Sequence, residues 1–217
     1  MRKVSVIVPI KNEPHINEHV NEVHKALSKI EHEIIVVDKS NKPPKIKDAK
    51  LVIQKSDGLG NAIIEGLRSS SGDVIITMDG DGSHRPEDLL KLIEKAKDFD
   101  IVIGSKYVTG GRTEDEEYRI IISKIYCRFA SFVLGLNVKD NMSGFAAVRR
   151  KVYEKIKPRS SGFKINMEIL YKAKKFGFKA TEVPIVFLKR KLGKSKANWR
   201  EAFRTIRFVF ELKLGLK

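Results

Sequence analysis

An apolar run that ends in two acids constrains this chain more than any other feature. Val74 to Met78 is typical of a strand buried on both faces of a parallel sheet. Asp79, Gly80 and Asp81 follow at once, and Pro86 then predicts the first turn of a helix. Open α/β sheets bind ligands beyond the carboxyl ends of their strands. Two carboxylates at such an end predict a site for a hard divalent cation that takes substrate phosphates as further ligands. The alternative is an acidic turn that only ends a strand.

The rest of the chain alternates between apolar strands and amphipathic helices. Strands are predicted at 4–10, 33–38, 51–53, 100–104, 144–148 and 180–187, and helices at 16–30, 62–68, 89–96, 119–135 and 166–176. Strands that are apolar throughout predict a largely parallel sheet sandwiched between helices. Pro184 predicts that the last strand lies at an edge or contains a bulge. Residues 108–117, with two glycines and four acids, form a candidate lid.

Composition narrows the class of protein. A chain of 217 residues forms one domain, or one domain with an appendage. The single cysteine, Cys127, forms no internal disulfide and fits a reducing compartment. No stretch reaches the ~20 apolar residues of a membrane span, and no signal peptide is predicted. His15 and His19 lie one helical turn apart, where we expect exposed histidines rather than a metal site.

The C-terminal segment carries a concentrated positive charge. Residues 189–217 contain ten Lys or Arg and two acids, which is half of the net charge of +16. Their partner is nucleic acid, an anionic membrane or a phosphorylated substrate. One face of the predicted tail helix holds Trp199, Phe203, Ile206, Phe210 and Leu214, and the opposite face holds Arg200, Arg204, Arg207 and Glu211. Such a helix lies in a membrane interface or docks its apolar face on the domain.

A series of short motifs runs in order along most of the chain. They are Val8-Pro9-Ile-Lys-Asn12-Glu13, Gly58-Leu-Gly-Asn-Ala62, Gly66, Gly72-Asp73, Met78-Asp-Gly-Asp81, Gly104-Ser-Lys-Tyr107, Ser143-Gly-Phe145, Gly162-Phe-Lys-Ile165 with Glu168, Arg190 and Gly193-Lys-Ser-Lys196. Together, from Val4 to about Lys196, they resemble family 2 glycosyltransferases, and within these the dolichol-phosphate (polyprenyl-phosphate) mannose synthases.

The resemblance implies an α/β fold of the glycosyltransferase A type, which is Rossmann-like, and a role for each motif. The nucleotide of the donor would be lined by Pro9, Lys11, Glu13, Val37 and Asp38. Asp79, Gly80 and Asp81 would hold Mg²⁺ or Mn²⁺ against the diphosphate, with Ser83 as a further candidate ligand. The acceptor phosphate would meet Lys106, Arg119 and Ser123, and the donor would meet Lys164, Arg190 and Lys196. Glu168, a candidate base in relatives with hydroxyl acceptors, is expected to act by positioning.

This implied chemistry agrees with the residues present. A cation together with Arg and Lys neutralises the charge left on a departing diphosphate. A lipid phosphate is already an anion, so it needs positioning more than a general base. We therefore expect direct displacement with inversion at the sugar carbon.

Four residues depart from the family pattern. Lys11 replaces a Tyr, Lys39 a second Asp, Ser83 a Gln and Lys106 an Arg, which costs bidentate phosphate geometry. Because these changes concern donor and acceptor recognition, the sugar can differ from mannose.

Several functions remain open at this level. The favoured one is transfer of mannose from GDP-mannose to dolichyl or polyprenyl phosphate. Its alternatives are a UDP-sugar donor of the glucose type, a non-lipid acceptor, a sugar nucleotidyltransferase and a non-enzymatic polyanion-binding protein. A processive polysaccharide synthase is discounted because Gln-x-x-Arg-Trp is missing from the sequence.

The expected organisation is a catalytic domain at residues 1–196 and a basic amphipathic helix at 197–217. We expect a peripheral enzyme on the cytoplasmic face of a membrane with anionic lipids. A separate membrane subunit is a possible partner. Nucleic acid is not, because aromatic residues are only 8% and no basic–aromatic platform occurs.

Overall fold

The computed structural model describes residues 3–189 and 199–216. Within them, a main sheet contains β1 (Val4–Ile10), β2 (His32–Asp38), β3 (Lys50–Ile53), β4 (Val74–Thr77), β5 (Ile101–Ser105), β7 (Ala146–Arg149) and β8 (Ala180–Pro184). A small second sheet pairs β6 (Arg112–Thr113) with β9 (Val186–Phe187). The helices are α1 (Ile16–Ala26), α2 (Leu59–Arg68), α3 (Leu89–Lys95), α4 (Glu117–Leu134), α5 (Arg150–Ile156), α6 (Ile165–Lys175) and α7 (Trp199–Lys213), with a 3₁₀ turn, η1 (Pro86–Asp88), before α3.

The main sheet is mostly parallel, as predicted. Its order is β3-β2-β1-β4-β7-β5-β8, and β7 alone runs antiparallel to both of its neighbours. The predicted central strand is β4, which is buried along its whole length between β1 and β7. Pro184 lies in β8 at the end of the sheet order, which confirms its edge position.

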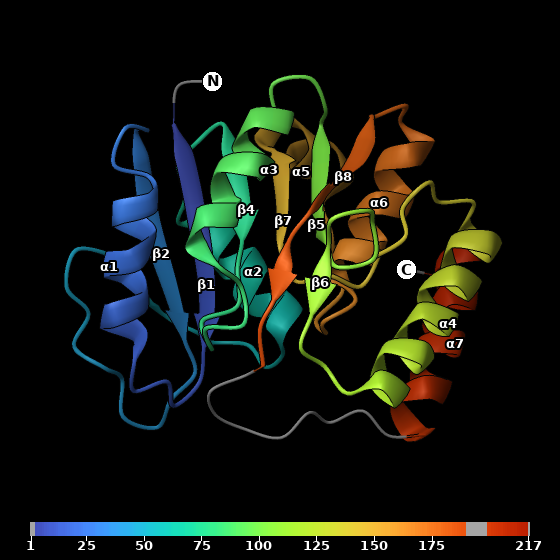
Figure 1. The fold of residues 1–217 in the computed structure, drawn as a ribbon, viewed down its shortest axis with the longest axis horizontal. Helices are drawn as coiled ribbons and strands as arrows, with labels where there is room; N and C mark the ends of the chain where they lie inside the picture. The colour runs from blue at the N-terminus through green and yellow to red at the C-terminus, as the bar shows by residue number, and fades with distance from the viewer. Residues whose placement is uncertain (1–2, 190–198, 217) are drawn as a thin grey trace.

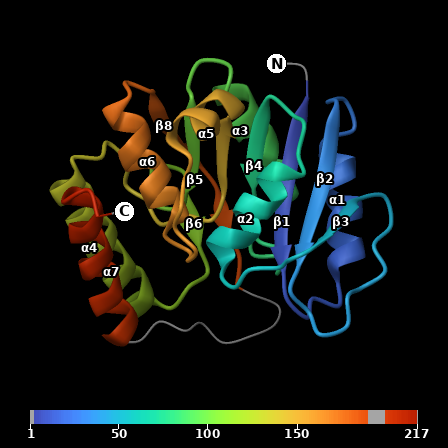
Figure 2. The same cartoon turned by 180° about the vertical axis from the view of Figure 1, so that it is seen from behind.

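Two layers of helices cover the sheet (Figures 1 and 2). One face packs against α1 and α3 through side chains such as Val20 and Leu92. The other face packs against α2, α5 and α6, which lie in front in Figure 2. The carboxyl ends of the parallel strands lie at the lower edge in Figure 1, and the predicted ligand residues follow these ends.

The Gly58-Leu-Gly60 motif allows close packing of two backbone segments. A β-carbon on Gly60 would lie 1.9 Å from the backbone oxygen of Ser160, and one on Gly58 would lie 2.3 Å from that of Ser161. The Gly60 N–H donates to the Ser161 oxygen at 2.7 Å. The two glycines therefore let the start of α2 lie against the backbone of residues 160–161.

The last helix, α7, packs beside α4, as both views show (Figures 1 and 2). Phe208, Val209 and Leu212 are buried in the same core cluster as residues of the sheet. Burial of each such side chain contributes about 1.5–3 kcal/mol. The predicted boundary at residue 196 lies outside the described residues, so a separate C-terminal unit stays a prediction.

Candidate active site at the carboxyl edge of the sheet

Two glycines, Gly80 and Gly144, leave the space that the acid turn, Asp79-Gly80-Asp81, needs. A β-carbon on Gly80 would lie 2.5 Å from Ile10 Cγ2, so only glycine lets this turn lie against the end of β1. A β-carbon on Gly144 would lie 3.1 Å from Asp79 Oδ1 and 3.2 Å from its Oδ2. Gly144 thus leaves the space that the Asp79 carboxylate occupies.

Ser83 holds the second acid of the turn in place. Its hydroxyl donates to Asp81 Oδ1 at 2.5 Å and its backbone N–H donates to the same oxygen at 3.1 Å. Ser83 is fully buried. The residue therefore positions Asp81, and a direct contact of its hydroxyl with a cation stays a prediction.

His84 accepts a hydrogen bond from the backbone of Asp79, the first acid of the turn. The backbone N–H of Asp79 donates to His84 Nδ1 at 3.2 Å, so this nitrogen acts as an acceptor. The ring stacks on Phe145, with 4.8 Å between ring centres. Burial lowers the pKa of His84, although Asp79 and Asp81 act to raise it. A neutral His84 thus braces the turn.

Three of the residues predicted to line the nucleotide, Pro9, Val37 and Asp38, lie at the ends of β1 and β2. Pro9 pairs in register with Val37, and Ile10 with Asp38. Asp38 is 1% exposed, and its Oδ1 accepts the N–H and hydroxyl of Ser40 at 3.0 and 2.5 Å. Its Oδ2 is buried and has no hydrogen-bond partner among the described residues. A buried acceptor without a partner is costly, and it suits a ligand N–H or O–H.

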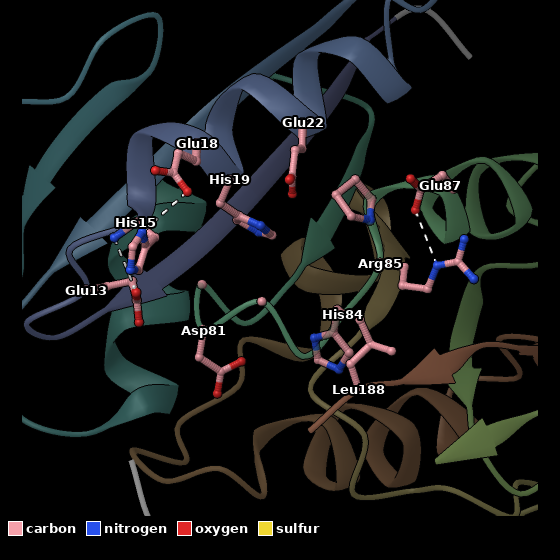
Figure 3. A pocket seen from close by; sticks show the side chains of 13 residues that line it. Glu13, His15, Glu18, His19, Glu22, Asp81, His84, Arg85, Glu87 and Leu188 are labelled. Atoms are coloured by element: carbon pink, nitrogen blue, oxygen red, sulfur yellow. Dashed lines mark hydrogen bonds and ion pairs between the residues drawn. The ribbon is translucent and has the colours of Figure 1, made fainter. Parts of the chain in front are cut away.

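A cavity of about 280 Å³ lies between α1 and the acid turn (Figure 3). Gly80 and Asp81 line it from one side, and Glu13, Glu18 and Glu22 from the other. His19, expected at an exposed position, is buried at 5% exposure beside this cavity. The many carboxylates that line the cavity disfavour a free diphosphate and favour a diphosphate that enters with a cation. A second cavity, of about 570 Å³, contains none of the predicted site residues.

Two of the three predicted acceptor residues, Lys106 and Ser123, lie beside Tyr107, which follows β5. The ammonium groups of Lys106 and Lys124 lie 5.3 and 5.4 Å from the centre of its ring. Burial raises the pKa of the Tyr107 phenol, and Ser123 acts to lower it. Lys106 also donates its backbone N–H to Asp140 Oδ2 at 3.2 Å. Burial raises the pKa of Asp140, against the influence of Lys106.

The remaining predicted site residues have separate positions. Arg119 lies one turn before Ser123 on α4, and its Nε donates to Tyr118 at 2.9 Å and pairs with Glu116 at 3.1 Å. Lys11 is exposed, and Glu13 accepts the N–H of His15 at 3.4 Å. The Lys164 ammonium lies 4.1 Å from the Phe163 ring and 6.0 Å from Phe208 of α7. Arg190 and Lys196 lie outside the described residues.

Glu168 is placed to hold backbone rather than to act as a base. Its fully buried carboxylate accepts the N–H of Arg159 at 3.0 Å and that of Ser160 at 2.7 Å, and it pairs with Lys172. Burial acts to raise the pKa of Glu168, but these partners outweigh it and the pKa is lowered. The group stays ionised and fixes the loop that packs on Gly58 and Gly60.

The acid turn fits a cation that is shared with substrate. In residues 3–189 and 199–216, no set of three or more His, Cys, Asp or Glu side chains is arranged to hold a metal by itself. Asp79 and Asp81 supply two carboxylates, and the space beside Gly144 accommodates the first of them. Mg²⁺ and similar ions often take one or two carboxylates and complete their shell with waters and phosphates.

Comparison with known proteins identifies the family. The model of "Glycosyl transferase family 2" matches residues 5–157, which include the acid turn and β7. The chain belongs to glycosyl transferase family 2.

Curated relatives in this family include three named for lipid phosphates. The dolichol-phosphate mannosyltransferase of Pyrococcus furiosus is 38% identical over 97% of this chain and 63% of its own length. The polyprenol monophosphomannose synthase of Mycolicibacterium smegmatis is 38% identical over 67% of this chain and 59% of its own length. The undecaprenyl-phosphate mannosyltransferase of Micrococcus luteus is 37% identical over 65% of this chain and 61% of its own length. The chain spans about three fifths of the length of these relatives.

Solved structures confirm the fold. Glucosyl-3-phosphoglycerate synthase of Mycobacterium tuberculosis with Mn²⁺, UDP-glucose and phosphoglyceric acid has a TM-score of 0.72 at 19% identity, covering 99% of this chain and 79% of that chain. The same enzyme with Mg²⁺ and UDP has a TM-score of 0.71, also at 19% identity, covering 99% and 79%. Both of these structures of the mycobacterial enzyme contain a divalent ion of the kind that was predicted for the acid turn.

Four residues around the site were not assigned a role from the sequence. Gly144 and Tyr107 belong to motifs that carry the family resemblance, which was their only signal. Asp140 and Phe187 carried no signal, because their contacts with Lys106 depend on pairing between distant segments.

Proposed function

We propose that this chain transfers mannose from GDP-mannose to dolichyl or polyprenyl phosphate. The observation that supports this most is the 38% identity to the Pyrococcus furiosus enzyme across 97% of the chain. The acid turn and the cluster of Lys106 and Ser123 provide the two halves that such a transfer needs. One half suits a nucleotide diphosphate and the other suits a phosphate acceptor.

The donor half depends on charge and on one buried acceptor. Asp38 Oδ2 would accept a hydrogen bond from the nucleoside. Asp79 and Asp81 would hold Mg²⁺ or Mn²⁺, and Ser83 and His84 keep these acids oriented. When bound, the ion would neutralise the charge that develops on the departing diphosphate.

The acceptor half works by positioning. Lys106, Arg119 and Ser123 would hold the lipid phosphate so that one of its oxygens faces the sugar carbon. That oxygen forms the new bond while the bond from sugar to diphosphate breaks, so the configuration at carbon inverts. Because the phosphate is already an anion, no residue needs to remove a proton. Lys164, Arg190 and Lys196 are proposed donor contacts.

A two-phase assay tests the proposal. The chain is incubated with Mn²⁺, polyprenyl phosphate and sugar-labelled GDP-mannose, with UDP-glucose as the competing donor. Transfer should move the label into the organic phase. Because the displacement inverts the sugar carbon, the α-linked mannose of the donor should become β-linked in the product. Label that stays in water with every donor, or a product of retained configuration, would contradict the proposal. Asp81→Asn serves as the inactive control.

We further propose that the acceptor is reached from an anionic membrane surface through α4 and α7. No helix within the described ranges is long and apolar enough to span a bilayer. Both helices instead expose apolar stripes that point away from the core. Ile121, Ile125 and Phe132 of α4 are 58%, 60% and 87% exposed. Phe203 and Phe210 of α7 are 66% and 48% exposed, and Leu214, which follows α7, is 71% exposed. The rings of Phe129 on α4 and Phe210 on α7, whose centres are 6.2 Å apart, connect the two stripes.

The face of α7 that was predicted to be apolar is therefore exposed, because a different face docks. Thr205, Phe208, Val209 and Leu212 face the core. Arg204 and Arg207 are exposed beside the apolar stripe, which suits anionic headgroups.

Vesicle sedimentation tests the membrane proposal. Phe203→Ser and Phe210→Ser together should lower binding to anionic vesicles at least tenfold, because each Phe contributes on the order of 1.5 kcal/mol or more on burial. Phe176→Ser is the matched control, since Phe176 is 53% exposed at the end of α6, away from both stripes. Equal binding by the double variant and by the control would refute the role of the stripes.

A further inference from the structure

The ammonium group of Lys106 lies between two aromatic rings. Its Nζ is 4.4 Å from the ring centre of Phe187 and 5.3 Å from that of Tyr107. Both distances lie within the range of about 6 Å in which a ring face attracts a cation. We call this pair of rings the aromatic cradle. Tyr107 is the next residue in the chain, but Phe187 comes from β9, 81 residues away.

The cradle holds the ammonium without an ion pair, while the charge of Lys106 also acts on the buried Asp140. In the part of the chain that the structure describes, no carboxylate forms an ion pair with Lys106. A ring face orients a cation but carries no net charge, so the full charge stays available to an incoming anion. A carboxylate partner would instead have to be displaced. This matters at a position where the family pattern has Arg, because a flexible Lys loses more side-chain entropy on binding than a preorganised guanidinium.

Phe187 also contacts the acid turn. Its ring lies edge-on to His84, with 5.3 Å between ring centres, and its backbone forms a bridge with that of His84. The next residue, Leu188, donates its N–H to the Ser83 oxygen at 2.9 Å. On its other side, Phe187 pairs with Thr113 of β6. One ring therefore touches both the brace of the acid turn and the ammonium of the acceptor half.

We infer that Phe187 is a positioning residue that sets the Lys106 ammonium at a fixed place relative to the acid turn. In this role it prepares Lys106 for the acceptor phosphate, and this inference rests on the proposed function. Phe187 acts through Lys106 and His84 and itself takes no part in bond making. Its removal should weaken acceptor binding selectively, because His84 keeps its stack on Phe145 and its bond to Asp79.

Steady-state kinetics on three variants tests the inference. Phe187→Leu keeps an apolar side chain and removes the ring face, and Phe187→Tyr restores it. Phe178→Leu is the matched control, because Phe178 is half-buried and carries the Lys151 ammonium at 5.6 Å on another part of the fold. The KM for polyprenyl phosphate should rise about threefold to tenfold in Phe187→Leu. It should stay within about twofold in Phe187→Tyr and Phe178→Leu, and the KM for the donor should not change in any variant.

Two outcomes overturn the inference. One is a Phe187→Leu protein whose acceptor KM equals that of Phe178→Leu. The other is a Phe187→Leu protein in which the donor KM rises or kcat falls while the acceptor KM stays constant, because that pattern indicates a general loss of structure.

A second readout separates this inference from the proposed function. Reductive ¹³C-methylation of lysines gives a methyl NMR signal for Lys106, assigned with Lys106→Arg. The cradle predicts a ring-shifted signal in the wild type and in Phe187→Tyr, and an unshifted one in Phe187→Leu. A wild-type chain that transfers no sugar but shows this pattern overturns the proposed function and keeps the cradle. An unshifted wild-type signal overturns the cradle whatever the activity.

Discussion

Gly144→Ala should weaken the response to the metal while leaving the fold intact. The three atoms nearest to an added β-carbon all belong to the Asp79 carboxylate, at 3.1 to 3.4 Å. Ordinary contacts begin at 3.4 Å, so the two carboxylate oxygens must move by about 0.2–0.3 Å. Metal sites tolerate about ±0.2 Å in ligand distance, and changes behind a ligand typically cost about 10- to 100-fold in affinity. The Mn²⁺ concentration for half-maximal activity should therefore rise about tenfold or more.

A metal titration of transfer activity, with thermal unfolding in parallel, decides this prediction. Gly144 has no positive φ, so alanine introduces no backbone strain, and the free energy of unfolding should fall by less than about 1 kcal/mol. Gly177→Ala is the control, because Gly177 has φ +76° and no atom within 4 Å of an added β-carbon. It should lose about 1 kcal/mol of stability and keep the metal response. A folded Gly144→Ala protein with an unchanged Mn²⁺ requirement would refute the reasoning.

Three further perturbations address other parts of the structure. Glu33 accepts hydrogen bonds from Ser5 at 2.6 Å and from Lys3 at 3.1 Å; burial acts to raise its pKa, but these bonds and those from Ser71 lower it to about 2. Because the pKa of Glu33 is lower in the folded than in the unfolded chain, where it is near 4.5, the ionised carboxylate stabilises the fold at higher pH. The free energy of unfolding should therefore fall by about 1–2 kcal/mol, a value discounted for partial exposure, as the pH falls from about 5 to 2. Glu33→Gln should lack the same stabilisation at pH 7, and urea unfolding at several pH values measures both effects. Gly60→Ala should destabilise the chain by about 3 kcal/mol or leave it unfolded, because backbone rather than a flexible side chain opposes the methyl group, and circular dichroism reports it. Asp38→Ala should raise the Kd for GDP about 10- to 100-fold by calorimetry, since a hydrogen bond to a charged group is lost, and an unchanged Kd would place the nucleotide elsewhere.

Local patterns in the sequence were sufficient to predict the parallel sheet and the place of the two acids at its edge. Strands that are apolar throughout, such as Val4–Ile10, predicted the parallel sheet because both of their faces are covered. The position of Asp79 and Asp81 at the carboxyl edge followed from the end of a buried strand. The expectation of an edge position for Pro184 depended only on its missing N–H. These features are local, so a single sequence contains them.

Features that depend on long-range pairing were beyond the sequence. β7 follows α4 yet inserts between β4 and β5, which no local pattern encodes. The tail helix has apolar residues on two sides, and only the surface of α4 decides that Phe208 and Val209 dock while Phe203 stays exposed. The contact of Phe187 with Lys106 likewise exists only because β9 pairs with β6. α5, which begins directly after the last residue of β7, was not predicted.

The place of the cation and the diphosphate is the central claim, and anomalous diffraction tests it most directly. Crystals of the chain soaked with Mn²⁺ and GDP, and measured near the manganese edge, should show one strong peak bonded to the carboxylates of Asp79 and Asp81, with the diphosphate on its far side. A peak away from this turn, or a nucleotide bound there while both acids point elsewhere, would contradict the account.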